Sequence, residues 1–273
     1  MFGPGRDQQL FVENLRRAVP DARELNARTA RGSWWWGGTF RGRPVKVSLL
    51  GRHDFLSGVQ YCAALGPLPI RMYVEGHYAH YSHAKVVTTG DAEFDRLYKV
   101  HGLPAEVVGA ALDAPTRAWY LQTYGERSPQ TTAEDAWLHV YRSYRKTFDS
   151  TVLPDHAVPT AEEIARFLEA AIGLSDRLTG AYESLRASIA QGQGAAAAER
   201  WHAAQLGVLR DAEQASKRRR LVIFGIVGLV FAVPLLLVLG FVLLVILSGC
   251  GGDGFSEAGE ALDSGSGSLE STF

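Results

Sequence analysis

Hydrophobic and polar residues follow different patterns along the chain, and the most distinctive pattern is a run without charge. Residues 221–247 are 27 consecutive positions that contain no Asp, Glu, Lys or Arg. A helix of this length spans ~40 Å, more than the ~30 Å hydrocarbon core of a bilayer. Backbone N–H and C=O groups in lipid must be paired within the segment, so the run predicts one transmembrane helix near the carboxyl end. Pro234 removes one backbone donor and predicts a kink in it.

A second pattern, with apolar residues at steps of three and four, predicts a helical stalk or hairpin over residues 158–216. It opens with a capping box, in which the Thr160 hydroxyl accepts the Glu163 N–H and the Glu163 side chain reaches back. Two glycines within residues 191–194 interrupt it. Its apolar stripe must pack on its own domain, on the neighbouring helix or on a second copy of the chain. The stripe consists of Ile164, Phe167, Leu168, Ala171, Leu174, Leu178, Tyr182, Leu185 and Ile189.

Shorter aromatic and β-branched runs predict strands in residues 1–157. The runs 33–40 and 44–50, joined by a turn at residues 41–43, are typical of a β-hairpin. Further strands are expected at residues 69–74, 85–89 and 136–141, and helices at residues 6–18 and, in two pieces, 103–124. Asp113 with Pro115 predicts the cap of the second piece. The order of elements indicates a mixed sheet-and-helix α+β domain.

Three adjacent tryptophans lie in the first predicted strand. Trp34, Trp35 and Trp36 cannot share one face, because successive strand residues point to opposite sides of a sheet. Two alternatives remain open: an aromatic core on a half-buried sheet, or a tryptophan that contacts a partner or a membrane surface.

Charges beside the apolar run predict its orientation. A basic cluster directly precedes it, and residues 249–273 carry acids but neither Lys nor Arg. The positive-inside bias therefore predicts a cytoplasmic amino-terminal domain and an acidic, disordered Gly/Ser tail outside the cell membrane. No apolar run near Met1 resembles a signal peptide, in agreement with that orientation. The topology signal consists of Lys217, Arg218, Arg219 and Arg220, within a basic-plus-transmembrane region of residues 217–248.

Composition limits the partners. The chain has 28 Lys and Arg against 29 Asp and Glu, and the basic cluster is its main concentration of positive charge. We therefore expect the lipid bilayer and a protein as partners, and no nucleic acid. Cys62 and Cys250 fall on opposite sides of the predicted membrane, and neither has the spacing of a zinc site. The residues before Cys250 look like a lipobox, which leaves lipoprotein processing, S-acylation and chance as alternatives.

Three histidines are the candidate metal ligands. His77, His80 and His83 would share one face of a helix and hold a divalent cation there. The flanking residues favour a strand or loop instead, and on a strand His80 would face away from the other two. We expect no bound cofactor and no catalytic residue here, with a metal site as the alternative.

Three carboxylates close together form the other candidate. Asp91, Glu93 and Asp95 lie within five residues. Gly90 and Asp91 are typical of a turn that caps a short helix, with Phe94 as a core anchor and Asp95 as a surface charge. Paired acids could serve as acid and base or bind Mg²⁺, but the chain has no Walker A loop and no dinucleotide fingerprint to accompany them.

This acidic stretch also carries a resemblance. The positions Thr89, Gly90, Asp91, Phe94, Asp95, Tyr98 and Val100, followed by a Pro-started helix with Arg117, Ala118 and Leu121, resemble a segment of uncharacterised bacterial membrane-anchored proteins. The likeness covers residues 34–145. It implies a link from strand to helix within an α+β domain and a bacterial origin, and it implies no activity.

These features together predict a single-pass membrane protein. Its cytoplasmic α+β domain is expected to act as a non-enzymatic interaction or sensing module, with a second copy of the chain as one candidate partner through the stalk. The alternative is a membrane-tethered, metal-dependent hydrolase that uses residues 77–83.

Overall fold

The computed structural model divides the chain into two compact units, residues 1–212 and 213–273. The described residues are 6–26, 33–52, 55–76, 85–125, 130–134, 136–143 and 158–211 in the first unit, and 214, 232, 234, 236–241 and 243 in the second. The first unit combines one large sheet with helices, so the α+β class is confirmed.

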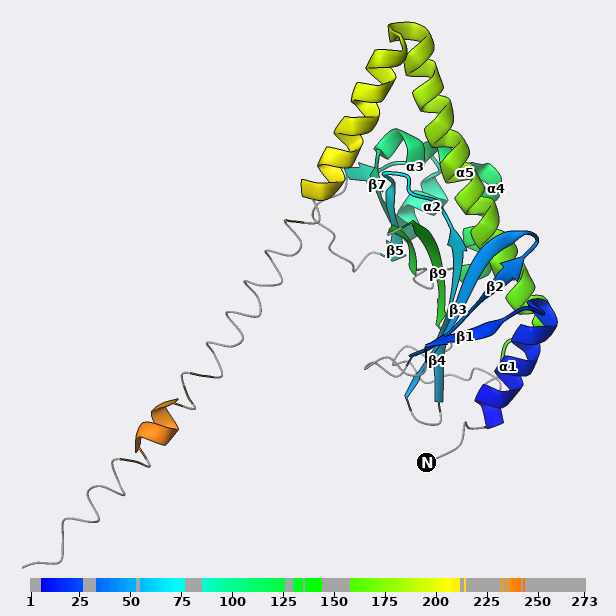
Figure 1. Ribbon diagram of the computed structural model, residues 1–273, viewed down its shortest axis with the longest axis vertical. Helices are drawn as coiled ribbons and strands as arrows, with labels where there is room; N and C mark the ends of the chain where they lie inside the picture. Colours follow the sequence, from blue (N-terminus) through cyan, green and yellow to red (C-terminus); the bar gives the residue numbers. More distant parts are fainter. Residues whose placement is uncertain are drawn as a thin grey trace, which may run out of the picture. The chain divides into compact units, whose positions relative to one another are not determined.

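The first unit is built on a nine-stranded sheet in which neighbouring strands pair antiparallel (Figure 1). The strands are β1 (Arg23–Asn26), β2 (Ser33–Phe40), β3 (Arg43–Arg52), β4 (Phe55–Ala64), β5 (Arg71–Gly76), β6 (Lys85–Val87), β7 (Tyr98–Leu103), β8 (Gln130–Glu134) and β9 (Trp137–Ser143). Their order across the sheet is β1-β2-β3-β4-β9-β8-β5-β7-β6. The central pair, β4 with β9, joins segments more than 70 residues apart in sequence.

The helices are α1 (Arg6–Ala18), α2 (Ala92–Leu97), α3 (Ala105–Ala111), α4 (Ala114–Tyr124) and α5 (Ala161–Gln193). A further helix, residues 195–211, follows α5 and is called the return helix below. The predicted β2–β3 hairpin is confirmed. Its turn places Arg41 and Gly42 at φ of 49° and 76°, the left-handed pair that matches the twist of a tight hairpin.

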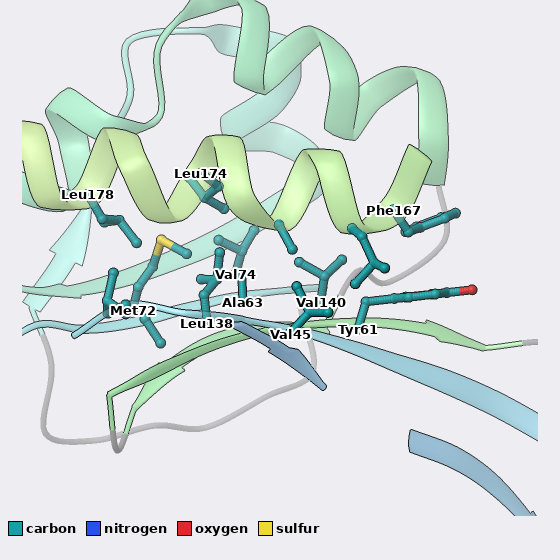
Figure 2. Close-up of a cluster of buried hydrophobic side chains, with 14 of the residues drawn as sticks. Val45, Tyr61, Ala63, Met72, Val74, Leu138, Val140, Phe167, Leu174 and Leu178 are labelled. Atoms are coloured by element: carbon teal, nitrogen blue, oxygen red, sulfur yellow. The ribbon is translucent and has the colours of Figure 1, made fainter. Parts of the chain in front are cut away.

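The core lies between one face of the sheet and the helices, and α5 crosses it (Figure 2). Phe167, Leu174 and Leu178 of α5 point toward sheet residues such as Tyr61 and Leu138. The Tyr61 and Phe167 rings stack with centroids 4.9 Å apart. Each such apolar side chain contributes ~1.5–3 kcal/mol before ordering costs. The apolar stripe of the predicted stalk, from Ile164 to Tyr182, is therefore buried within the chain's own first unit, against the sheet, α1, α3 and, at Tyr182, the return helix.

Polar contacts fix how α5 lies on the sheet. Arg43 pairs with Asp176 at 2.6 Å, and Arg41 pairs with Glu169. The Ser175 hydroxyl donates to the carbonyl oxygen of Ala64 at 2.8 Å. The ion pairs are partly exposed and each stabilises by only ~0–1 kcal/mol, so they set the position of α5 more than its stability.

β9 is a central strand, between β4 and β8, although its carboxyl end combines aromatic and basic residues. The guanidinium carbon of Arg142 lies 5.0 Å from the centre of the Phe167 ring, and the guanidinium pairs with Glu163. The interruption expected across residues 191–194 is present but narrower than expected, since α5 continues to Gln193 and only Gly194 is non-helical.

Candidate functional site

The face of the sheet opposite α5 carries the polar residues. Side chains alternate along each strand, so the neighbours of the core residues in Figure 2 point the other way. Strand pairing then brings one residue from each of six strands into a single line across the sheet, called the polar row below. The polar row consists of Lys46, Cys62, His139, Thr132, Tyr73 and His101.

The centre of the polar row is a hydrogen-bonded histidine. Gln60 Nε2 lies 2.8 Å from His139 Nδ1, within hydrogen-bond distance. Cys62 Sγ lies 3.2 Å from the same nitrogen. Cys62 is fully buried, and burial raises the pKa of its thiol to about 12. Cys62 is therefore a protonated, buried thiol and a poor nucleophile.

Aromatic and charged groups surround this centre. Lys46 Nζ lies 3.8 Å from the centre of the Trp137 ring, a cation–π contact. The Tyr73 hydroxyl donates to Glu134 Oε2 at 3.4 Å. Trp35 shares this side of the sheet, whereas Trp36 packs on Phe11 of α1 with ring centroids 5.5 Å apart. The tryptophans are thus split between the faces. On the polar face Cys62, Tyr73 and His101 are buried, whereas Lys46, Thr132, His139, Trp35 and Trp137 are partly exposed.

The acidic stretch is a structural turn. The Asp91 side chain accepts the Phe94 N–H at 3.1 Å and begins α2, as predicted, and Phe94 is fully buried. Two interactions lower the pKa of Asp91. The larger is the hydrogen bond from the Phe94 N–H, and the next is the hydrogen-bonded ion pair with Arg117 at 3.1 Å. Asp95 is more than the expected surface charge, because its carboxylate accepts the N–H groups of Thr89 and Gly90, each at 3.1 Å.

Asp113 has the same kind of role at the start of α4. Its side chain accepts the Thr116 N–H at 2.9 Å, and Arg177 of α5 donates to it at 3.0 Å. Hydrogen bonds from Thr116 and Arg177 lower the pKa of Asp113. These acids therefore hold helix starts and connect α4 to α5.

The candidate metal ligands His77, His80 and His83 lie outside the described residues. Within the part of the chain that the structure describes, no group of three or more His, Cys, Asp or Glu side chains could hold a metal ion.

The predicted transmembrane run is described only at residues 232, 234, 236–241 and 243, all of which are helical. Among the described residues, no helix has both the length and the apolar character needed to cross a bilayer. The basic cluster Lys217, Arg218, Arg219 and Arg220, the tail and Cys250 lie outside them.

Sequence reasoning missed the polar row. One pattern in the sequence could have indicated it, because Trp137, His139 and Tyr141 occupy every second position of one strand and therefore share a face. The neighbours of β9 in the sheet are set by pairing between segments distant in sequence. This pairing places Gln60 and Cys62 beside His139.

Comparison of the chain with protein-family models, curated proteins and solved structures found no match.

Proposed function

We propose that this is a single-pass membrane protein whose cytoplasmic α+β domain is a non-enzymatic interaction or sensing module. One helix within residues 221–247 anchors it, and the tail after residue 248 lies outside. The observation that carries the proposal is a run of exposed apolar side chains on helical residues 236–241. Leu236, Leu237, Val238, Leu239 and Phe241 are each between 58% and 69% exposed.

Water is a poor environment for such a run. Each large apolar side chain gains ~1.5–3 kcal/mol when it leaves water. Soluble surfaces rarely keep contiguous apolar patches of this kind uncovered. Hydrocarbon chains would cover all sides of the helix at once, and the apolar sequence continues on both sides of residues 236–241.

The orientation follows from charge. Lys217, Arg218, Arg219 and Arg220 precede the apolar run, and no Lys or Arg follows it. The cost of moving this cluster across the bilayer keeps the preceding domain on the cytoplasmic side.

The interaction role is supported by what the domain's polar groups do. Asp91, Asp95 and Asp113 are engaged as helix caps and turn acceptors. The polar face combines partly exposed Trp35 and Trp137 with hydrogen-bonding groups, a composition typical of protein interfaces.

The anchor is tested by alkaline extraction of membranes that contain the full chain. The wild type should stay in the membrane pellet. A Leu237→Arg and Leu239→Arg double variant should shift to the supernatant, because each charge costs ~2.5–3.5 kcal/mol near the centre of a membrane helix. Val208→Arg is the matched control, since Val208 is exposed on the return helix, and it should stay in the pellet. Release of the wild type would contradict the anchor.

The non-enzymatic role is tested by elemental analysis of the purified full chain. We expect less than stoichiometric zinc, manganese or iron. One tightly bound ion per chain, lost on substitution of His77, His80 and His83, would favour the metal-dependent hydrolase instead.

A further inference from the structure

The return helix is joined to α5 by a single residue. α5 ends at Gln193, the return helix begins at Ala195, and Gly194 alone makes the reversal at the tip seen in Figure 1. Gly194 has φ 88° and ψ 158°, a conformation essentially restricted to glycine. A Cβ added there would meet no atom within 4 Å, so only backbone conformation restricts this position.

A small set of contacts holds the return helix against α5. The rings of Tyr182 and Trp201 lie 5.0 Å apart, and the Tyr182 hydroxyl lies 2.6 Å from His202 Nδ1. Arg186 pairs with Glu199 at 2.5 Å. Among residues 195–211, all of which are described, Ala198 alone is fully buried. We call these contacts the latch.

We propose that the return helix also docks on α5 of a second copy of this chain, by straightening at Gly194. In that arrangement residues 161–211 form one helix ~75 Å long. Two such helices run antiparallel about a two-fold axis, and every latch contact is remade between chains. The proposal names the partner of the interaction module, and it rests on the proposed function in that a shared membrane concentrates the copies.

The local sequence supports both arrangements. Residues 195–198 are four alanines, the strongest helix formers, so a helix can continue through this point. The connection between the two helices is only one residue long. Short hinges of this kind favour exchange of a helix between copies of a chain. Tyr182 is fully buried although it lies near the end of the sheet contact, because Trp201 and His202 cover it. An open chain must therefore cover Tyr182 again, and a second return helix has the matching residues.

Cross-linking between two differently tagged full chains tests the exchange. One chain carries Arg186→Cys, the other Glu199→Cys, and both carry Cys250→Ser; buried Cys62 stays. The chains are co-expressed, and native membranes are treated with a short bis-maleimide. We expect a mixed-size covalent dimer. With Arg210→Cys in place of Glu199→Cys, about 16 Å further along the helix, the mixed product should be lost.

The hinge has a matched control in the same chain. Gly192 is helical and a Cβ there also meets no atom within 4 Å. Gly192→Ala stabilises hairpin and straight helix alike, whereas Gly194→Ala penalises the hairpin alone. The dimer has two hinges, so Gly194→Ala should raise the dimerisation constant at least ~30-fold relative to Gly192→Ala, measured by sedimentation in detergent.

Three results would overturn the exchange. The first is that no mixed product forms when residue 194 is glycine. The second is that the Gly194→Ala and Gly192→Ala chains dimerise equally. The third is that Gly194→Ala opens the hairpin but leaves the chain monomeric. Sedimentation in detergent measures dimerisation whether or not the chain inserts into a membrane. A chain that fails alkaline extraction yet still exchanges would refute the anchor alone, and an anchored chain without exchange would refute the dimer alone.

Discussion

The packing of α5 on the sheet leads to a quantitative prediction for Leu178→Ala. Leu178 is fully buried and lies over the sheet near Met72 (Figure 2). Removing its side chain leaves a cavity between two rigid layers, which costs ~2–5 kcal/mol. That is a large part of the ~5–15 kcal/mol that typically stabilises a folded protein.

The control is Leu185→Ala, two turns further along α5. Leu185 is only partly buried, so its truncation leaves a space open to water rather than a closed cavity. Both variants make the same Leu-to-Ala change within the same helix, so intrinsic helix propensity cancels. The loss at position 185 should be less than half of that at position 178.

The assay is thermal and urea unfolding of the full chain in detergent, followed by tryptophan fluorescence and circular dichroism. For a unit of about 200 residues, each kcal/mol lowers Tm by ~2–4 °C, so Leu178→Ala should lower Tm by ~4–20 °C. Equal shifts for the two variants, or an unchanged Tm for Leu178→Ala, would show that α5 does not close the core.

Three further predictions concern single polar groups. Tyr98→Phe should cost ~0.5–1.5 kcal/mol in urea unfolding, because the Tyr98 hydroxyl donates to the Gly125 carbonyl at 2.6 Å; an unchanged midpoint would refute that bond. The lowered pKa of Asp113 gives stability that is present above its unfolded pKa and is lost as pH falls through the folded value. Asp113→Asn should therefore flatten the loss of Tm below about pH 4, and an unchanged slope would contradict this. In a Cys250→Ser chain, Cys62 should resist maleimide at pH 7.5 until denaturant is added, since burial raises its pKa; fast labelling detected by mass spectrometry would show an open thiol.

The parts of the fold that sequence predicted are those fixed by neighbours in the chain. Thr160, Asp91 and Asp113 each accept an N–H three residues ahead, so the start of each helix is decided locally. The β2–β3 hairpin is likewise set by its turn at Arg41 and Gly42.

The parts that sequence missed are fixed by distant pairing. β8 has the sequence Gln-Thr-Thr-Ala-Glu, which contains no large apolar residue, yet it lies between β9 and β5 with Thr131 fully buried. β4 includes Gly58, Gln60 and Cys62, which hide its alternation. Strand preference depends on the neighbours a strand acquires in the sheet, so neither this pairing nor the polar row it assembles could be derived from local pattern.

The central claim, a cytoplasmic domain anchored by one helix, is tested most directly by a topology reporter. An enzyme that is active only outside the cytoplasm is fused after Phe273 of the full chain. The account predicts an active fusion, and it predicts scrambled or inverted insertion when Lys217, Arg218, Arg219 and Arg220 are all changed to Gln. An inactive fusion in a stably inserted wild-type protein would contradict it.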